Sequence, residues 1–332
     1  MKALVTGGGG FVGRYVVEQL LARGDKVTVF TRGAYPELTA MGVTVFRGDL
    51  SDEVAVMEAC KGIDCVFHIA AKAGAWGDEA DFYNTNVVGT QNVITACRVN
   101  GIRKLVNCSS PSVIFDNKAH EGVAEDYPYP DSYECPYPET KAKAEQLVTA
   151  ANDETLMTVT LRPHLIIGPR DRHLLPQVLK AAAGGTLPQV GKGDNFVDLS
   201  YVEDVARAHL LAADALKPGS NVPGSVYFIS QDEPVNLWPW LRNLLKRTGY
   251  PEPKFSVSLG VARFAAGIME WFYRNFVPNG TPKLTRFLAS ELALSHYYDI
   301  SAAKCDLGYT PSKTMQEVED IVVEWVTEGM PS

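Results

Sequence analysis

Short apolar runs alternate with amphipathic segments through the first half of the chain. Between the runs, apolar residues recur at helical spacing, as in 86–100 and 140–151, and Val12, Val16 and Leu20 share one face of another expected helix. The runs are rich in β-branched and aromatic residues and lie at 2–6, 26–30, 43–48, 65–70, 104–109 and 157–163. Six buried strands that alternate with helices predict an α/β fold with a doubly wound parallel sheet.

The pattern changes after Pro163, where turn-forming residues become frequent, and aromatic residues and proline are dense from Asn236 onward. Residues 196–214 predict a return of the chain to the sheet followed by a helix, and 224–230 predict one more strand. We therefore expect a smaller C-terminal substrate lobe with a discontinuous boundary. The expected nucleotide-binding domain is 1–165 plus 194–231, and the expected substrate lobe is 166–193 plus 232–332.

The segment 255–276 is strongly apolar, but Arg263, Glu270 and Arg274 interrupt it. A spanning helix needs roughly 20 predominantly apolar residues. We expect a helix that covers an apolar pocket. The alternative is a helix at a membrane surface, which would give the protein a peripheral membrane contact.

The glycine-rich stretch TGGGGFVG at 6–13 follows the first predicted strand and opens a helix. Glycine permits positive φ and lets backbone N–H groups approach a pyrophosphate at the helix N-terminus. This context predicts a Rossmann-type dinucleotide-binding turn. Two registers fit, one with Gly8 and the other with Gly7 as the first glycine, and both continue to Gly10 and Gly13.

The end of the second predicted strand indicates which nicotinamide cofactor binds. NAD sites place an acidic residue there to hold the ribose 2′-hydroxyl, whereas NADP sites offer a cation to the 2′-phosphate. This chain has Thr31 and Arg32 at that point. The pattern favours NADP(H), although Arg32 also fits an ordinary solvated arginine.

Tyr137 and Lys141 stand four residues apart, on one face of a predicted helix. A carbonyl that gains or loses hydride needs a proton donor or acceptor and a second group that fixes its oxygen. The Lys141 charge is expected to lower the Tyr137 pKa from about 10 towards neutrality. Ser109, Ser110 and Ser112 follow the fifth predicted strand, and any of them could donate to the substrate oxygen.

Along nearly its whole length, the chain resembles the extended short-chain dehydrogenase/reductase superfamily. The resemblance implies that Ser110, Tyr137 and Lys141 form the catalytic set, with Tyr137 as acid or base. Pro136 and Pro138 depart from the expected pattern and predict that the helix begins at or just before Tyr137. The matching pieces are TGGGGFVG, GDL (48–50), HIAA (68–71), NVVGTQNV (86–93), SS (109–110), YPETK (137–141) and LRPHLIIGPRD (161–171).

The resemblance also implies cofactor contacts along the ends of the strands, and a homodimer in which the helices near Asn86 and Tyr137 pair. It favours the register that starts at Gly7, which leaves Gly8 and Gly9 as permissive spacers. The implied cofactor residues are Gly7, Gly10, Phe11, Val12, Gly13, Thr31, Arg32, Asp49, Leu50, Ala70, Ala71, Lys72, Asn86, Ser109, Tyr137, Lys141, Pro163, His164 and Leu165.

Residues 196–212 and 296–311 are similar to the 3β-hydroxysteroid dehydrogenase branch of the superfamily. Within it, the chain resembles bacterial 2-alkyl-3-oxoalkanoate reductases of olefin biosynthesis and sterol 4α-carboxylate 3-dehydrogenases. Both groups act at a 3-oxygen beta to a carboxylate on a hydrophobic skeleton. With Arg32, this favours an NADPH-dependent reductase of a hydrophobic 3-oxo acid in lipid metabolism. The alternatives are a sterol or 3β-hydroxysteroid dehydrogenase and, less favoured because the second lobe is apolar, a nucleotide-sugar epimerase or dehydratase.

Such a substrate needs a largely apolar pocket with few polar anchors. Ser112, His164 and Arg286 are candidate substrate residues; the last two could meet a carboxylate, and Arg286 equally fits a surface salt bridge. The candidate pocket aromatics, about half of which are expected to be core residues, are Trp238, Trp240, Phe264, Trp271, Phe272, Phe276 and Phe287.

Composition narrows the remaining classes of function. The 332 residues carry a net charge of −8, which disfavours nucleic acid as a partner. The six cysteines show no metal-ligand spacing, so no metal site is expected. The cysteine pattern and the lack of a signal-peptide pattern before the first strand predict a cytoplasmic protein.

Overall fold

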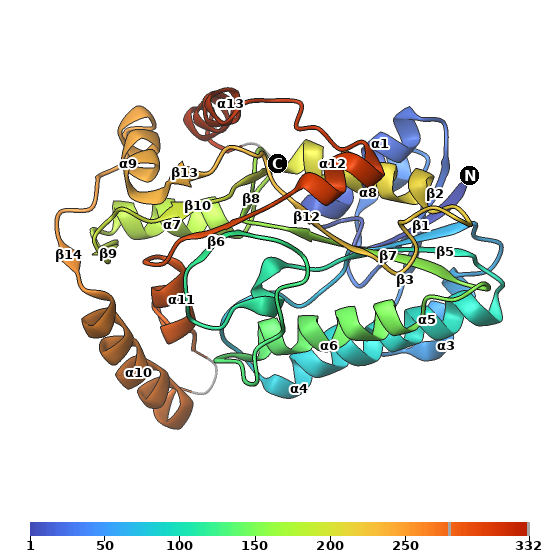
Figure 1. The fold of residues 1–332 in the computed structure, drawn as a ribbon, viewed down its shortest axis with the longest axis horizontal. Helices are drawn as coiled ribbons and strands as arrows, with labels where there is room; N and C mark the ends of the chain where they lie inside the picture. Colours follow the sequence, from blue (N-terminus) through green and yellow to red (C-terminus); the bar gives the residue numbers. More distant parts are fainter. Residues whose placement is uncertain (278–279, 331–332) are drawn as a thin grey trace.

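The computed structural model describes residues 1–277 and 280–330, and its centre is a seven-stranded parallel sheet (Figure 1). The strand order is β12-β7-β5-β4-β1-β2-β3, so the Rossmann-type doubly wound sheet is confirmed. The strands are β1 (Lys2–Thr6), β2 (Lys26–Thr31), β3 (Thr44–Arg47), β4 (Cys65–His68), β5 (Lys104–Cys108), β7 (Met157–Pro163) and β12 (Val226–Ile229). The order reverses between β1 and β4, and ligands of such sheets bind beyond the carboxyl ends of the strands at this point.

Helices cover both faces of the sheet (Figure 1). One side carries α1 (Phe11–Ala22), α8 (Val202–Ala215) and α12 (Ser301–Leu307), and the other carries α3 (Glu53–Ala59), α5 (Gly89–Val99) and α6 (Pro136–Ala150). Two clusters of buried apolar side chains, one on each side of the sheet, form the core. Shorter elements complete this part: α2 (Pro36–Ala40), α4 (Glu79–Phe82), the π-helical turn η1 (Tyr83–Val88) and the 3₁₀ turn η2 (Pro111–Ile114).

A smaller four-stranded sheet, in the order β13-β10-β15-β6, lies beyond the carboxyl ends of the central strands. Its strands are β6 (His120–Val123), β10 (Phe196–Val197), β13 (Val235–Asn236) and β15 (His296–Tyr298). The nearby helices are α7 (Leu174–Ala183), α9 (Leu237–Arg247), α10 (Leu259–Phe276), α11 (Arg286–Glu291) and α13 (Met315–Thr327). Two small pairs join β8 (Ile166–Ile167) to β11 (Ser200–Tyr201) and β9 (Gln189–Val190) to β14 (Ser256–Val257). The chain crosses between the two parts several times, since β6 joins the smaller sheet and α12 returns to the larger one.

The prediction that residues 196–201 return to the central sheet is wrong. This run divides into β10, which joins the smaller sheet, and β11, which pairs with β8. Asp198 interrupts the run, and its buried carboxylate accepts the backbone N–H of Tyr298 at 2.9 Å, which ties the segment to β15. The helix and strand predicted after it are confirmed as α8 and β12.

Candidate active site

The turn between β1 and α1 is closed by three glycines in contact. Gly7 adopts a φ of +71°, and a Cβ there would lie 2.9 Å from the Cα of Ala70 at the end of β4. The N–H of Gly10 donates to the carbonyl of Gly7 at 2.8 Å, and a Cβ on Gly13 would lie only 2.2 Å from that same oxygen. The packing therefore supports the register Gly7, Gly10 and Gly13, and it leaves the start of α1 free to face an anion.

Gly8 and Gly9 are not the permissive spacers that the sequence suggested. A Cβ on Gly8 would lie 2.5 Å from the Val29 side chain, and one on Gly9 would lie 2.3 Å from the Tyr35 ring. Side chains of β2 and of the loop after it fill the space next to both glycines. A side chain at Gly8 would thus meet a core residue, whereas one at Gly9 would require the Tyr35 ring to move.

Thr31 and Arg32 lie at the end of β2 and line the same cleft as the glycine turn. The Arg32 side chain is 73% exposed, and its guanidinium is 3.9 Å from the Asp49 carboxylate. Hydrogen bonds from Ser51 hold the Asp49 pKa below its usual value. Arg32 is thus a weakly paired cation at the distal end of the cleft.

Ser110, Tyr137 and Lys141 meet in the cleft, as the motif predicted. Ser110 follows β5, and its hydroxyl oxygen accepts the Ser112 hydroxyl at 3.0 Å. The helix α6 begins at Pro136, which confirms that Tyr137 lies in its first turn. A hydrogen bond with Ser110 places the Tyr137 phenol beside that hydroxyl.

The expected effect of Lys141 on Tyr137 is absent in this structure. The Lys141 ammonium is buried and donates to the Cys108 carbonyl at 2.6 Å. Burial lowers the Lys141 pKa, and burial raises the Tyr137 pKa to about 12, although the Ser110 hydrogen bond opposes this rise. The phenol is therefore protonated in this state, and the Lys141 ammonium is engaged by Cys108 rather than by Tyr137.

The cleft has a volume of about 710 Å³, within the range of small-molecule sites. All predicted cofactor and substrate residues line it except Lys72, Asn86 and Arg286. Ser109 contributes a buried hydroxyl that has no hydrogen-bond partner within residues 1–277 and 280–330. This unpaired hydroxyl and the glycine turn fit a bound dinucleotide.

The three exceptions have other partners. The Asn86 side chain bonds the backbone N–H and carbonyl of Lys72, and the Lys72 ammonium pairs with Asp81. Arg286 pairs with Glu270 of α10 at 2.8 Å, as a surface salt bridge does. Arg286 is therefore not a candidate for holding a carboxylate in this cleft.

Most of the predicted pocket aromatics lie elsewhere, and α10 does not cover the cleft. Phe287 on α11 lines the cleft, whereas Trp238 is a core residue. Phe264, Trp271, Phe272 and Phe276 project from α10 into solvent, because its interior contacts are limited to small residues such as Ala262 and Ala266. The alternative of a helix at a surface fits this exposure.

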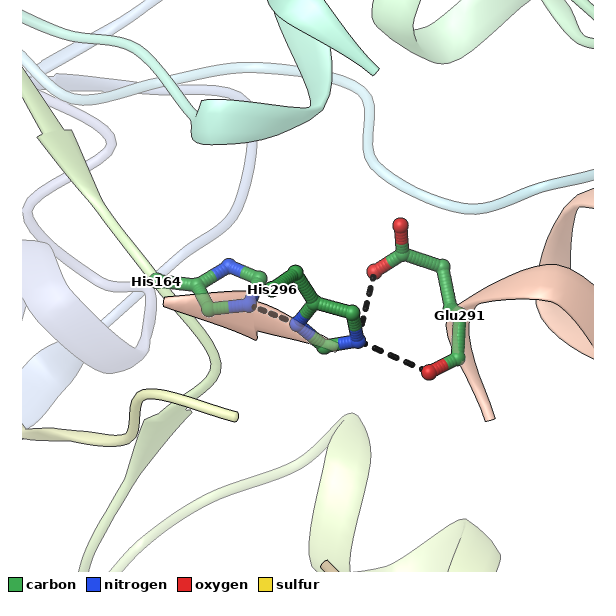
Figure 2. Close-up of side chains that lie close together, drawn as sticks. All are labelled: His164, Glu291 and His296. Atoms are coloured by element: carbon green, nitrogen blue, oxygen red, sulfur yellow. Dashed lines mark hydrogen bonds and ion pairs between the residues drawn. The ribbon is translucent and has the colours of Figure 1, made fainter. Parts of the chain in front are cut away.

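Two cleft-side residues, Glu291 and His296, were missed by the sequence reasoning. They lie next to His164 (Figure 2), and Nε2 of His164 is 2.6 Å from Nδ1 of His296. Nε2 of His296 is 2.7 Å from the Glu291 carbonyl oxygen and 3.9 Å from its carboxylate. The sequence signal was weak, since 132 positions separate the two histidines.

Comparison with known proteins identifies the family. The profile of the 3-beta hydroxysteroid dehydrogenase/isomerase family matches residues 4–259. This chain belongs to that family. A 2-alkyl-3-oxoalkanoate reductase from Stenotrophomonas maltophilia is 45% identical over 320 residues, which cover 96% of this chain and 97% of the relative. The sterol-4-alpha-carboxylate 3-dehydrogenase, decarboxylating, of Mus musculus is 35% identical and covers 97% of this chain and 90% of its own.

Solved structures agree with the fold. MoeE5 in complex with UDP-glucose and NAD superimposes with a TM-score of 0.77 at 26% identity, and all of both chains is covered. Membership of the family makes the chain an oxidoreductase that uses a nicotinamide cofactor. Within the described ranges, no helix is both long enough and apolar enough to cross a membrane.

Proposed function

We propose that this protein is an NADPH-dependent reductase that converts a hydrophobic 2-alkyl-3-oxo acid to the 3-hydroxy acid. The observation that carries the proposal is the meeting of Ser110, Tyr137 and Lys141 in one cleft with the glycine turn and Phe287. The relatives named 2-alkyl-3-oxoalkanoate reductase, at 45% and 42% identity, support this substrate class.

In the proposed reduction, different residues of the cleft bind the carbonyl, hold the cofactor and donate the proton. Ser110 and Tyr137 hydrogen-bond the 3-oxo group, which fixes the carbonyl and polarises it. The glycine turn, Ser109, Pro163 and Leu165 hold the cofactor, which supplies a hydride when bound. Tyr137 gives its proton to the developing alkoxide, and Lys141 stabilises the phenolate that remains once it moves from Cys108.

The preference for NADPH over NADH rests on Arg32. Its exposed guanidinium, only 3.9 Å from Asp49, is available to a 2′-phosphate, and Thr31 places no carboxylate at the strand end. Thr31→Asp should shift the preference towards NADH, measured as the ratio of kcat/KM for the two cofactors. An unchanged ratio would refute this role for the strand end.

The activity is tested with NADPH and a panel of 2-alkyl-3-oxo acids, 3-oxo-sterols and nucleotide sugars, followed at the nicotinamide absorbance. We expect turnover with the 3-oxo acids. Tyr137→Phe should reduce turnover by orders of magnitude while NADPH still binds, and Tyr250→Phe, which removes a hydroxyl outside the cleft, is the matched control. Near-normal turnover of Tyr137→Phe would exclude it as the proton donor.

The leading alternative is a sterol-4α-carboxylate 3-dehydrogenase, because relatives with that name are 35–36% identical to this chain. Oxidation of a 3-hydroxysterol carboxylate, with no turnover of 3-oxoalkanoates, would favour it. Turnover of a nucleotide sugar would instead favour a nucleotide-sugar epimerase or dehydratase.

Two proposals concern assembly. Peripheral contact with a membrane through α10 is supported by its exposed aromatic residues and by the lipid-like substrate. A homodimer through α5 and α6, which lie side by side on the outer face of the sheet (Figure 1), is tested by sedimentation.

A further inference from the structure

Three side chains from distant parts of the chain form a continuous row at the cleft wall (Figure 2). His164 follows β7, His296 lies on β15 and Glu291 ends α11. His164 and Glu291 line the cleft that also holds Ser110 and Tyr137. The proposed reduction uses none of the three as a proton donor to the carbonyl.

The hydrogen bonds fix the tautomers of both neutral histidines. A carbonyl oxygen only accepts, so Nε2 of His296 must donate to the Glu291 carbonyl. Nδ1 of His296 then accepts, and Nε2 of His164 must donate to it. Nδ1 of His164 is consequently a bare acceptor. It points away from His296 (Figure 2), and no hydrogen bond to it is found in the described part of the chain.

The row does not fit a metal ion, although one donor atom from each residue lies within 4.8 Å of the others. Two nitrogens on one tetrahedral zinc are about 3.3 Å apart, given bonds of about 2.0–2.1 Å. The facing nitrogens here are 2.6 Å apart, which is a hydrogen-bond distance. The Glu291 carboxylate also approaches Nε2 of His296, whereas His164 meets Nδ1, so the three donors do not surround one point.

An acid in this cleft would find few cations. Of the described residues that line it, the basic ones are Arg32, Lys141, His164 and His173. Arg32 is at the cofactor's distal end, and Lys141 belongs to the catalytic set. His173 is exposed at the start of α7, whereas His164 is buried and lines the same cleft as Ser110 and Tyr137.

We propose that His164 binds the substrate carboxylate and that the His164–His296 pair takes up one proton from solvent when the acid binds. This inference rests on the proposed acid substrate. Protonation converts Nδ1 of His164 from an acceptor into a charged donor, and the Glu291 carboxylate 3.9 Å from His296 stabilises the resulting cation. His296 and Glu291 are positioning residues in this arrangement.

The surroundings disfavour a charge on His164 in the absence of a bound anion. Burial, His296 and His120 hold the His164 pKa well below its usual value. Besides Glu291 in the row itself, the charged or titratable groups around it are His120, Asp198, Tyr298 and, beyond His120, Asp116. Burial raises the pKa values of Glu291 and Asp198, so the environment penalises every isolated charge. When both charges are present, the substrate carboxylate and the protonated His164–His296 pair stabilise each other.

The direct test measures binding of decanoate and of decanol to the NADPH-loaded protein by calorimetry in buffers of different ionisation enthalpy. Decanoate should bind with uptake of about one proton, and its affinity should fall up to about tenfold per pH unit as pH rises through the pKa of the bound pair. Decanol should bind without proton uptake. Failure to bind decanoate, or binding without proton uptake, would overturn the proposal.

Three variants distinguish carboxylate binding by His164 from a purely structural role of the row. Glu291→Gln keeps the backbone carbonyl that orients His296 but removes the charge, so its decanoate affinity should fall several-fold while decanol affinity stays. His164→Gln should abolish proton uptake, and His173→Gln, which removes another histidine from the same cleft, should retain it. Equal losses for decanoate and decanol would indicate misfolding and contradict a carboxylate-specific role. These measurements need no turnover, so a protein that takes up a proton with decanoate but reduces no 3-oxo acid would refute the proposed function alone.

Discussion

Gly13 has no room for even a methyl group, since a Cβ would lie 2.2 Å from the Gly7 carbonyl oxygen and 2.9 Å from the Gly8 Cα. Gly13→Ala should therefore push the start of α1 away from the turn and weaken NADPH binding strongly. Overpacking of this kind lowers the free energy of unfolding by about 1–3 kcal/mol. Gly260→Ala is the control, because its Cβ would meet nothing within 4 Å. Fluorescence titration with NADPH and urea unfolding check both variants, and unaltered NADPH affinity in Gly13→Ala would contradict the packing argument.

At the scale of elements, a buried ion pair holds α6, the helix that carries Tyr137 and Lys141, against β7. The Glu145 carboxylate accepts from Nε and Nη2 of Arg162, and from the Tyr129 hydroxyl at 2.6 Å, and both charged side chains are buried. Glu145→Gln leaves an uncompensated buried guanidinium, which costs about 3–5 kcal/mol of unfolding free energy. Glu139→Gln breaks the exposed pair with Lys143 on the same helix and should cost at most about 1 kcal/mol. Similar urea midpoints for the two variants would show that the buried pair does not anchor α6.

The exposed aromatic side chains of α10 lead to a prediction about membrane binding. Phe264, Trp271 and Phe276 are each at least 60% exposed and lie on one helix. With a chain charge of −8, binding to vesicles should depend on apolar insertion rather than on anionic lipid. The protein should therefore co-sediment with phosphatidylcholine vesicles, and Trp271→Glu should lose this binding while it keeps its NADPH affinity. Val54→Glu, which replaces another exposed apolar side chain, on α3, is the matched control, and equal co-sedimentation of all three proteins would exclude α10 as the contact.

At the scale of the whole molecule, local signals predicted local structure well. The period of the apolar runs identified the central strands and the helices between them, and the spacing of Tyr137 and Lys141 correctly placed two of the three candidate catalytic residues in the cleft. Features that depend on contacts between residues far apart in the sequence could not be predicted from it. The division of residues 196–201 depends on Asp198 meeting β15, and the His164 row depends on β15 and α11 reaching the end of β7. How much of α10 is exposed depends on which parts of the fold pack against it. The spacing of apolar residues in the sequence does not give this information.

The cleft joins both parts of the molecule, since its lining runs from Gly7 to Glu291. A ligand that fills it should therefore stabilise the whole chain in one unfolding transition. At a free concentration of one hundred times its Kd, NADPH should add about 2.7 kcal/mol, which corresponds to a rise in Tm of roughly 4 °C for a chain of this size. NADH at the same concentration should give a smaller rise, because it offers Arg32 no 2′-phosphate, and Arg32→Gln should narrow the difference between the cofactors. Differential scanning calorimetry measures these shifts in Tm. Equal shifts with NADPH and NADH in the native protein would argue against selection of NADPH by Arg32. Two separate unfolding transitions would show that the larger sheet and the substrate side unfold independently.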